Sequence, residues 1–95
     1  MLKSITRLAS KYHDVKNMAE FNKIVSELKT PYVLDFYADW CGPCQKMMPT
    51  ITELESKSEG KWTLIKVNID EAELAELSDS HQIQGVPTLA FYKGA

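Results

Sequence analysis

The only two cysteines of the chain, Cys41 and Cys44, are three residues apart and form a candidate redox centre. The apolar run at residues 32–37 predicts a buried strand just before them, and the stretch after them predicts a helix. Residues i and i+3 share one face of a helix, so the two thiols can meet without backbone movement. This spacing predicts a disulfide that opens and closes.

Cys41 is the expected nucleophile because it is nearest the predicted helix N-terminus. Free backbone N–H groups and partial positive charge favour an anion at that end of a helix. The thiolate is such an anion and is the reactive form of cysteine. We therefore expect an exposed Cys41 with a depressed pKa, and Cys44, one turn inside the helix, as the resolving thiol. Pro43 suits the first helical turn, where a missing N–H costs little.

Two other interpretations of the cysteine pair are weaker. A structural zinc site takes four ligands, and beyond the pair the chain offers only His13 and His81, which are far apart in sequence. A purely structural disulfide closing so short a loop would constrain the unfolded chain little. We therefore expect neither a metal nor an organic cofactor.

Motifs in four places resemble the thioredoxin family. Segment 33–44, VLDFYADWCGPC, is similar to the family's active-site strand and turn. Pro49, segment 66–70 (KVNID) and segment 85–88 (GVPT) follow at the family's spacing, so the resemblance covers roughly residues 12–94. The Trp-Cys-Gly-Pro-Cys form is closer to thioredoxins proper than to disulfide isomerases or glutaredoxins.

The resemblance implies a protein-disulfide reductase that works by dithiol–disulfide exchange through Cys41 and Cys44. The implied partners are disulfide-containing target proteins and a thioredoxin reductase. A second hypothesis is a redox-dependent binding module that docks a partner protein with little turnover. A third, an oxidase or isomerase of disulfides, is disfavoured by Gly42 and Pro43 between the cysteines.

Asp35 lies in the apolar strand six residues before Cys41, where alternation puts it on the same face as Val33. Burial there would raise its pKa; the alternative is a side chain that reaches solvent at the strand end. The resemblance matches Asp35 to a buried general acid/base, which would take the proton from Cys44. It also matches Lys66 to a lysine near that carboxylate, whereas the alternative is an ordinary surface lysine.

The resemblance further implies a surface that docks the substrate. Pro87 matches a proline whose preceding peptide bond is cis in the family, so the backbone of Val86 would face an extended peptide. The other residues expected at this substrate-binding surface are Trp40, Gly42, Pro43, Ile69 and Gly85. The alternative for Trp40 is a residue of the core.

Alternating helix and strand patterns must position these residues. Helices are expected near residues 18–28, 41–57 and 71–80, and strands near residues 12–16, 32–37, 62–68 and 88–92. Asn17 and Glu20 form an expected capping box at the first helix. The order of elements and the resemblance predict an α/β thioredoxin fold, three-layer α/β/α with a central mixed sheet.

Composition suits one small domain. The 95 residues are 44% hydrophobic and carry a formal net charge of -2, so there is no basic excess to attract nucleic acid. No apolar run is long enough to span a bilayer, so we expect no membrane contact. Two cysteines in a C-x-x-C pattern suit a reducing compartment.

The N-terminal residues 1–13 form a basic extension before the domain at residues 14–95. The extension carries Lys3, Arg7 and Lys11, no acidic residue and an apolar stripe, a pattern typical of a mitochondrial transit peptide. The alternative is a short surface helix on a cytoplasmic protein.

Lys93 and Gly94 predict a hairpin turn after the last strand. The resemblance implies that an antiparallel edge strand and a final helix follow such a turn, so we expect a domain that is C-terminally truncated. Residues 88–92 would then be an uncovered sheet edge with unpaired backbone groups. Either the natural protein is longer, or the chain covers this edge as a homodimer.

Overall fold

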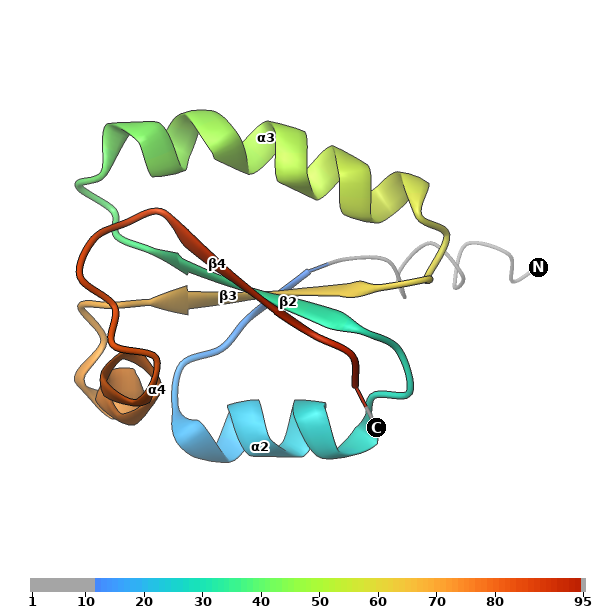
Figure 1. Cartoon of the computed structure of the whole chain (residues 1–95), viewed down its shortest axis with the longest axis horizontal. Coiled ribbons are helices and arrows are strands. Elements are labelled where there is room, and N and C mark those ends of the chain that lie inside the picture. The colour runs from blue at the N-terminus through green and yellow to red at the C-terminus, as the bar shows by residue number, and fades with distance from the viewer. Residues whose placement is uncertain (1–11, 95) are drawn as a thin grey trace.

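The computed structural model describes residues 12–94, which form a four-stranded sheet between helical layers (Figure 1). The strands are β1 (His13–Asp14), β2 (Tyr32–Tyr37), β3 (Thr63–Asn68) and β4 (Thr88–Tyr92), in the spatial order β1-β3-β2-β4. β1 and β2 are parallel to β3, whereas β4 is antiparallel to β2. The sheet is therefore mixed, as predicted.

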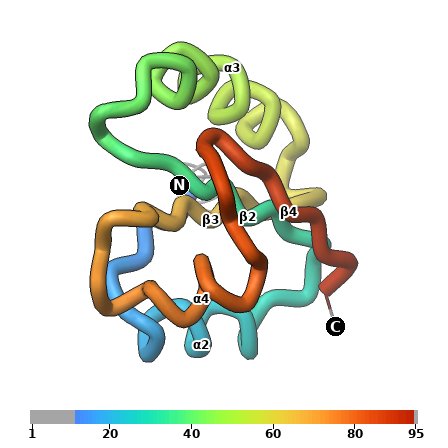
Figure 2. Tube along the Cα trace, turned by 60° about the vertical axis from the view of Figure 1, so that its left-hand side comes forward, coloured from blue at the N-terminus to red at the C-terminus, as the bar shows by residue number. Residues whose placement is uncertain are grey.

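Helices cover both faces of the sheet. The long helix α3 (Gly42–Lys57) lies over one face, and α2 (Met18–Glu27) and α4 (Ala75–Ser80) lie on the other side (Figures 1 and 2). The helix expected at residues 71–80 is divided into a short 3-10 helix, η1 (Ala72–Leu74), and α4. The predicted three-layer thioredoxin fold is confirmed.

The capping box expected at the start of α2 is only half formed. The Asn17 side chain accepts a hydrogen bond from the Glu20 backbone N–H at 2.8 Å, as a capping residue should. The Glu20 carboxylate accepts from the Lys16 N–H at 2.7 Å, not from the N–H of Asn17. The second bond of the predicted capping box is therefore wrong, because the backbone N–H that reaches the Glu20 carboxylate is that of Lys16, one residue before the N-cap.

Every residue of β2 is buried, because helices cover this strand on both sides. Leu34 packs with Phe21 of α2 on one face of the sheet. Val33 packs with Ile51 of α3 on the other face. Because side chains alternate along a strand, the side chain of Asp35 shares the α3 face with Val33. A carboxylate is thus held inside the layer between β2 and α3.

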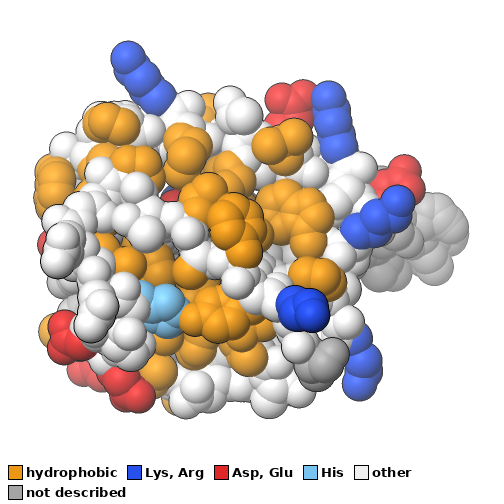
Figure 3. All heavy atoms as spheres, viewed as in Figure 1, with side chains coloured by type: hydrophobic (Ala, Val, Ile, Leu, Met, Phe, Trp, Pro, Cys, Tyr) orange, Lys and Arg blue, Asp and Glu red, His pale blue; other side chains and the backbone are white. Residues whose placement is uncertain are grey.

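An apolar groove runs between α3 and β4, which is the outer strand on that side of the described sheet. Hydrophobic side chains gather there in the space-filling view (Figure 3). Phe91 is 74% exposed and Leu54 is 56% exposed. The expected uncovered edge therefore corresponds to a strand with large exposed apolar side chains beside it.

Residues 1–11 of the basic extension lie outside the described residues, and the transit-peptide interpretation stays a prediction. Within residues 12–94, no helix combines the length and the apolar character needed to cross a membrane. The same residues contain no group of three or more His, Cys, Asp or Glu side chains that could hold a metal ion.

Candidate redox site

Cys41 and Cys44 form a disulfide at the N-terminus of α3, with their Cα atoms 5.2 Å apart. Cys41 is the N-cap residue, and its Sγ accepts a hydrogen bond from the Cys44 backbone N–H at 3.1 Å. Pro43 lies in the first turn, as predicted. A sulfur in this position receives a helix N–H and the positive end of the helix dipole, which stabilise negative charge.

The expected exposure of Cys41 is wrong. Cys41 is 4% exposed and Cys44 is 5% exposed, so the two disulfide-bonded residues are almost equally covered. The residues packed around the disulfide are Tyr37, Ala38, Ile69 and Val86. These neighbours come from β2 and from two loops distant in sequence, which close over a helix end that would be open in isolation.

Three segments bring the predicted docking residues to one end of the molecule, on the left in Figure 1. Gly42 and Pro43 are exposed beside the disulfide at the start of α3. Ile69 follows β3, and Val86 precedes β4; both contact the disulfide cluster. The Val86–Pro87 peptide bond is cis. Gly85, the remaining residue of this loop in the prediction, is exposed and has open space around its Cα.

Trp40 is 68% exposed, so it is a surface residue and not part of the core. Its indole Nε1–H donates a hydrogen bond to Asp70 Oδ2 at 2.8 Å. The Asp70 backbone N–H in turn donates to Asn68 Oδ1 at 2.9 Å. Sequence analysis assigned no role to Asp70, although it belongs to the segment 66–70 that carries the resemblance. These bonds fix the orientation of a large apolar side chain beside the cysteines.

Asp35 is buried, with 2% of its surface exposed, as predicted. Its Oδ1 has no hydrogen-bond partner among the described residues. Burial raises the pKa of Asp35, and the positive charge of Lys66 lowers it in part. Lys66 is the register partner of Asp35 on β3, so the predicted proximity of lysine and carboxylate is present.

Lys66 lies over an aromatic ring. Its Nζ is 4.1 Å from the centroid of the Tyr37 ring, and the Tyr37 hydroxyl donates to Asp14 Oδ1 at 3.1 Å. Lys66 forms no ion pair within 4.0 Å with another described residue. Sequence analysis assigned no role to Tyr37 or Asp14, because only the register of three strands brings them to Lys66.

Comparison with known proteins identifies the family. Residues 12–95 match the family model described as thioredoxin. The chain belongs to the thioredoxin family. A thioredoxin of Mycoplasmoides gallisepticum is 37% identical over 79 residues, which cover 83% of this chain and 75% of the relative. The mitochondrial thioredoxin of Rattus norvegicus is 34% identical over 88 residues, which cover 93% of this chain and 52% of the relative.

Solved structures agree with this assignment. The crystal structure of oxidised thioredoxin O2 from Arabidopsis thaliana is 40% identical to the chain and has a TM-score of 0.76. The match covers 90% of this chain and 76% of the plant protein. The shared fold thus includes a large part of both chains.

Family membership and the Cys41–Cys44 disulfide make the protein a thioredoxin-type disulfide reductase, an oxidoreductase with a redox-active disulfide. Thioredoxins in general act on disulfide-containing proteins and exchange electrons with thioredoxin reductase. The relatives include mitochondrial, chloroplastic and bacterial proteins, so membership of the family leaves the compartment open.

Proposed function

We propose that Cys41 is the attacking thiol of this reductase and that Cys44 is the resolving thiol. The observation that carries the assignment is the N-cap geometry, in which the Cys41 Sγ accepts the backbone N–H of Cys44. This bond strengthens when the acceptor is an anion, so it favours the thiolate of Cys41 over its thiol. The Cys44 sulfur caps no helix end and has less reason to ionise at neutral pH.

Two exchange steps complete the reaction. In the first, the Cys41 thiolate attacks a substrate disulfide, forms a mixed disulfide and releases one substrate thiolate, which takes a proton. In the second, the deprotonated Cys44 attacks Cys41 Sγ, forms the Cys41–Cys44 disulfide and releases the second substrate thiolate. The substrate disulfide is reduced by two electrons, and the protein dithiol is oxidised by two.

Asp35 is the proposed acceptor of the Cys44 proton. Its side chain is buried on the sheet face that α3 covers, and Cys44 lies in the first turn of that helix. A carboxylate with a raised pKa exchanges protons nearer neutral pH than an ordinary aspartate, which suits a general base. Lys66 offsets part of the burial effect and so keeps Asp35 able to ionise.

The substrate-binding surface in this proposal surrounds the disulfide. The exposed ring of Trp40 and the half-buried side chains of Ile69 and Val86 provide apolar contacts. The backbone of Val86, before Pro87, provides hydrogen-bonding groups that do not depend on the sequence of the substrate. The remaining members of this surface are Gly42, Pro43 and Gly85.

Trapping with Cys44→Ser tests the order of attack. This variant should accumulate a mixed disulfide on Cys41 with a disulfide-containing protein such as insulin, while Cys41→Ser should form none. The unaltered chain should reduce insulin catalytically with dithiothreitol as electron donor. Redox-dependent binding of a partner without turnover would contradict the reductase, and a mixed disulfide on Cys44 would reverse the two roles.

We also propose that the basic N-terminal extension directs the protein to mitochondria. Residues 1–13 carry three basic residues and no acidic one, and the chain resembles a mitochondrial thioredoxin of the rat. A fluorescent protein fused to residues 1–16 should enter mitochondria, and Lys3→Glu with Arg7→Glu should abolish entry. A diffuse cytosolic signal from the unaltered fusion would instead support a cytoplasmic protein.

We further propose that two copies of the chain pair through β4 to form a homodimer. The outer edge of β4 is complementary to a second copy of itself, since two antiparallel edges can exchange backbone hydrogen bonds. Pairing would also cover the exposed ring of Phe91. Sedimentation equilibrium should detect the dimer, and Phe91→Asp should weaken it. A monomer at every concentration measured would exclude this interface.

A further inference from the structure

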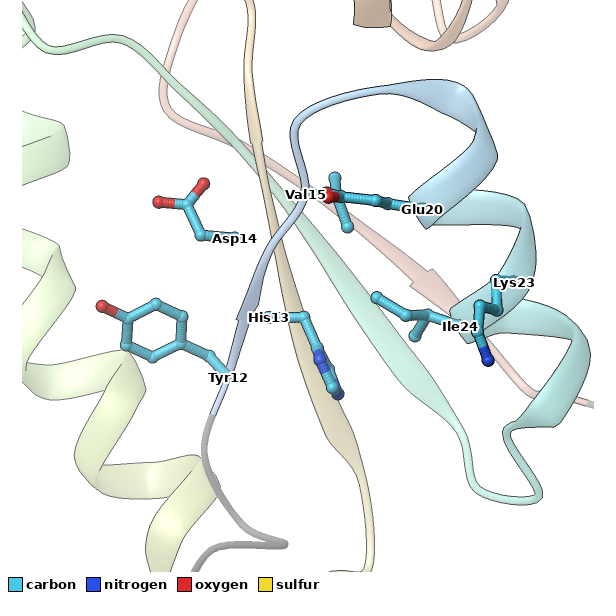
Figure 4. Close-up of a pocket in the computed structure, with 7 residues that line it drawn as sticks. All are labelled: Tyr12, His13, Asp14, Val15, Glu20, Lys23 and Ile24. Carbon is cyan, nitrogen blue, oxygen red and sulfur yellow. The ribbon is translucent and has the colours of Figure 1, made fainter.

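Three charged residues form a row across the sheet beneath α3. Lys66 of β3 is in register with Asp35 of β2 on one side and with Asp14 of β1 on the other. Paired residues of neighbouring strands point to the same face of a sheet. The close-up shows Asp14 of β1 and the preceding Tyr12 pointing toward α3, whereas Val15 lies toward α2 (Figure 4). One lysine is therefore placed between a buried carboxylate and a more exposed one.

The lysine contacts neither carboxylate, because an aromatic residue holds it. The Lys66 Nζ lies 4.1 Å from the centroid of the Tyr37 ring and 5.5 Å from that of Tyr12. At the first of these distances, attraction between an ammonium and the ring face is favourable, more so where water is excluded. Tyr37 is itself 6% exposed and packs against the cysteines, so its ring has little freedom to move.

Asp14 fixes the other end of the tyrosine. The Tyr37 hydroxyl lies 3.1 Å from Asp14 Oδ1 and 3.4 Å from Oδ2. Burial, followed by the negative charge of Asp14, raises the pKa of Tyr37, so its hydroxyl stays protonated and donates. Asp14 also lies 3.8 Å from the ammonium of Lys16.

We propose that Tyr37, anchored by Asp14, is a positioning residue that holds the Lys66 ammonium at a set distance from Asp35. This inference rests on the proposed role of Asp35 as the base for Cys44. The ring keeps the Lys66 ammonium close enough to favour the ionised form of Asp35. It also prevents a contact ion pair between the two side chains, which would make Asp35 a weak base. Tyr37 and Asp14 thereby set the pH at which the resolving step becomes fast.

The other groups facing this row are few. Asp39, before the disulfide, adds negative charge near Tyr37, and Asn68 of β3 adds a polar side chain. From α3, Thr52 and Ser56 line a cavity with Tyr12 and Asp14, and neither is charged. The buried carboxylate of that helix, Glu55, lies in its C-terminal half. Lys66 is thus the positive charge that acts on Asp35, and Asp14 is the nearby carboxylate that competes for it.

Two substitutions should shift the pKa of Asp35 in opposite directions. Tyr37→Leu frees the ammonium to approach the carboxylate of Asp14, so Asp35 loses its positive neighbour and its pKa rises further. Asp14→Asn removes the competing charge while its side-chain oxygen can still accept the tyrosine hydroxyl, so the pKa of Asp35 falls. A simple loss of packing would not produce two shifts of opposite sign.

The test measures two quantities on the reduced protein with the full chain. Carbon NMR of the side-chain carboxyl gives the pKa of Asp35, and stopped-flow kinetics gives the pH profile of mixed-disulfide resolution. Both midpoints should move up in Tyr37→Leu and down in Asp14→Asn. Tyr32→Leu is the matched control, because Tyr32 is a similarly buried tyrosine of β2 on the opposite face. It should lower stability and leave both midpoints in place.

The outcomes separate this inference from the proposed function. If Asp35→Asn leaves the pH profile of resolution unchanged, Asp35 is not the base, while the NMR shifts still test the positioning. If Asp35→Asn removes the pH dependence but Tyr37→Leu and Asp14→Asn leave the pKa of Asp35 in place, the positioning role is wrong. Should Tyr37→Leu fail to fold, an unchanged or raised pKa in Asp14→Asn is sufficient to overturn the proposal.

Discussion

Replacing Asp35 with asparagine should make the oxidised protein more stable above neutral pH. Asp35 is 2% exposed, and its Oδ1 has no hydrogen-bond partner among the described residues. A buried polar group without a partner costs about 1–3 kcal/mol, and a charged one costs more. Asparagine has a similar shape but cannot ionise, so it removes the cost of the charge and little else.

The pH dependence follows from the direction of the pKa shift. Burial raises the pKa of Asp35 above its ordinary value of 3.8, so the folded state holds this proton more tightly than the unfolded state. The stability linked to this proton is fully present below pH 3.8 and is lost as the pH rises through the raised pKa. Each unit of difference between the two pKa values corresponds to about 1.4 kcal/mol.

Thermal unfolding of the disulfide form over a range of pH measures the effect. We expect Asp35→Asn to be more stable than the unaltered protein above the raised pKa, by about 1.4 kcal/mol for each unit by which that pKa exceeds 3.8. For a domain of this size, each kcal/mol corresponds to roughly 4–8 °C in Tm. The control is Asp79→Asn, which alters an exposed aspartate of α4 and should change little at any pH. A stability difference that is the same at acidic and alkaline pH would refute the reasoning.

Three further predictions concern other residues of α3 and the redox site. Glu55 is 1% exposed and burial raises its pKa, so Glu55→Gln should raise Tm at alkaline pH without changing the rate of insulin reduction. In the reduced protein, Cys41 should react with iodoacetamide about tenfold faster than Cys44 at neutral pH; mass spectrometry of the alkylated peptides decides, and equal rates would contradict the N-cap argument. Trp40→Phe removes the hydrogen bond to Asp70, worth about 0.5–1.5 kcal/mol, and should raise KM for a protein disulfide roughly two- to tenfold. Trp62→Phe, at the apolar groove, is the control for that substitution and should leave KM unchanged.

Local patterns were enough to predict most of the fold. The apolar run of β2 and the helical stretch after it placed Cys41 and Cys44 on one strand-to-helix turn, and the structure confirms this. Alternation along β2 placed Asp35 on the same face as Val33, and the resemblance to thioredoxins was needed to favour its burial, which the structure shows. These features depend on residues that are neighbours in sequence, so periodicity and spacing can indicate them.

Features that depend on distant segments were missed. The burial of Cys41 comes from Ile69 and Val86, which approach from two later loops. The contact between Lys66 and Tyr37 requires the relative register of β2 and β3, and the anchor on Asp14 requires that of β1 as well. A shift of one residue in either register would turn the side chains of the shifted strand to the opposite face of the sheet. The sequence pattern within a single strand does not indicate which register forms.

The two buried carboxylates show why burial alone does not identify a catalytic acid. Asp35 and Glu55 are both almost fully covered, both have an oxygen without a partner among the described residues, and both have raised pKa values caused by burial. They differ in that only the pKa of Asp35 is offset by a nearby positive charge, that of Lys66. A general base must be able to lose its proton near working pH, and the lysine makes that possible for Asp35. Glu55 lies in the C-terminal half of α3, whereas the cysteines are at the N-terminus of the same helix. The positive neighbour, together with burial, supports the proposed proton transfer to Asp35 and distinguishes this carboxylate from Glu55.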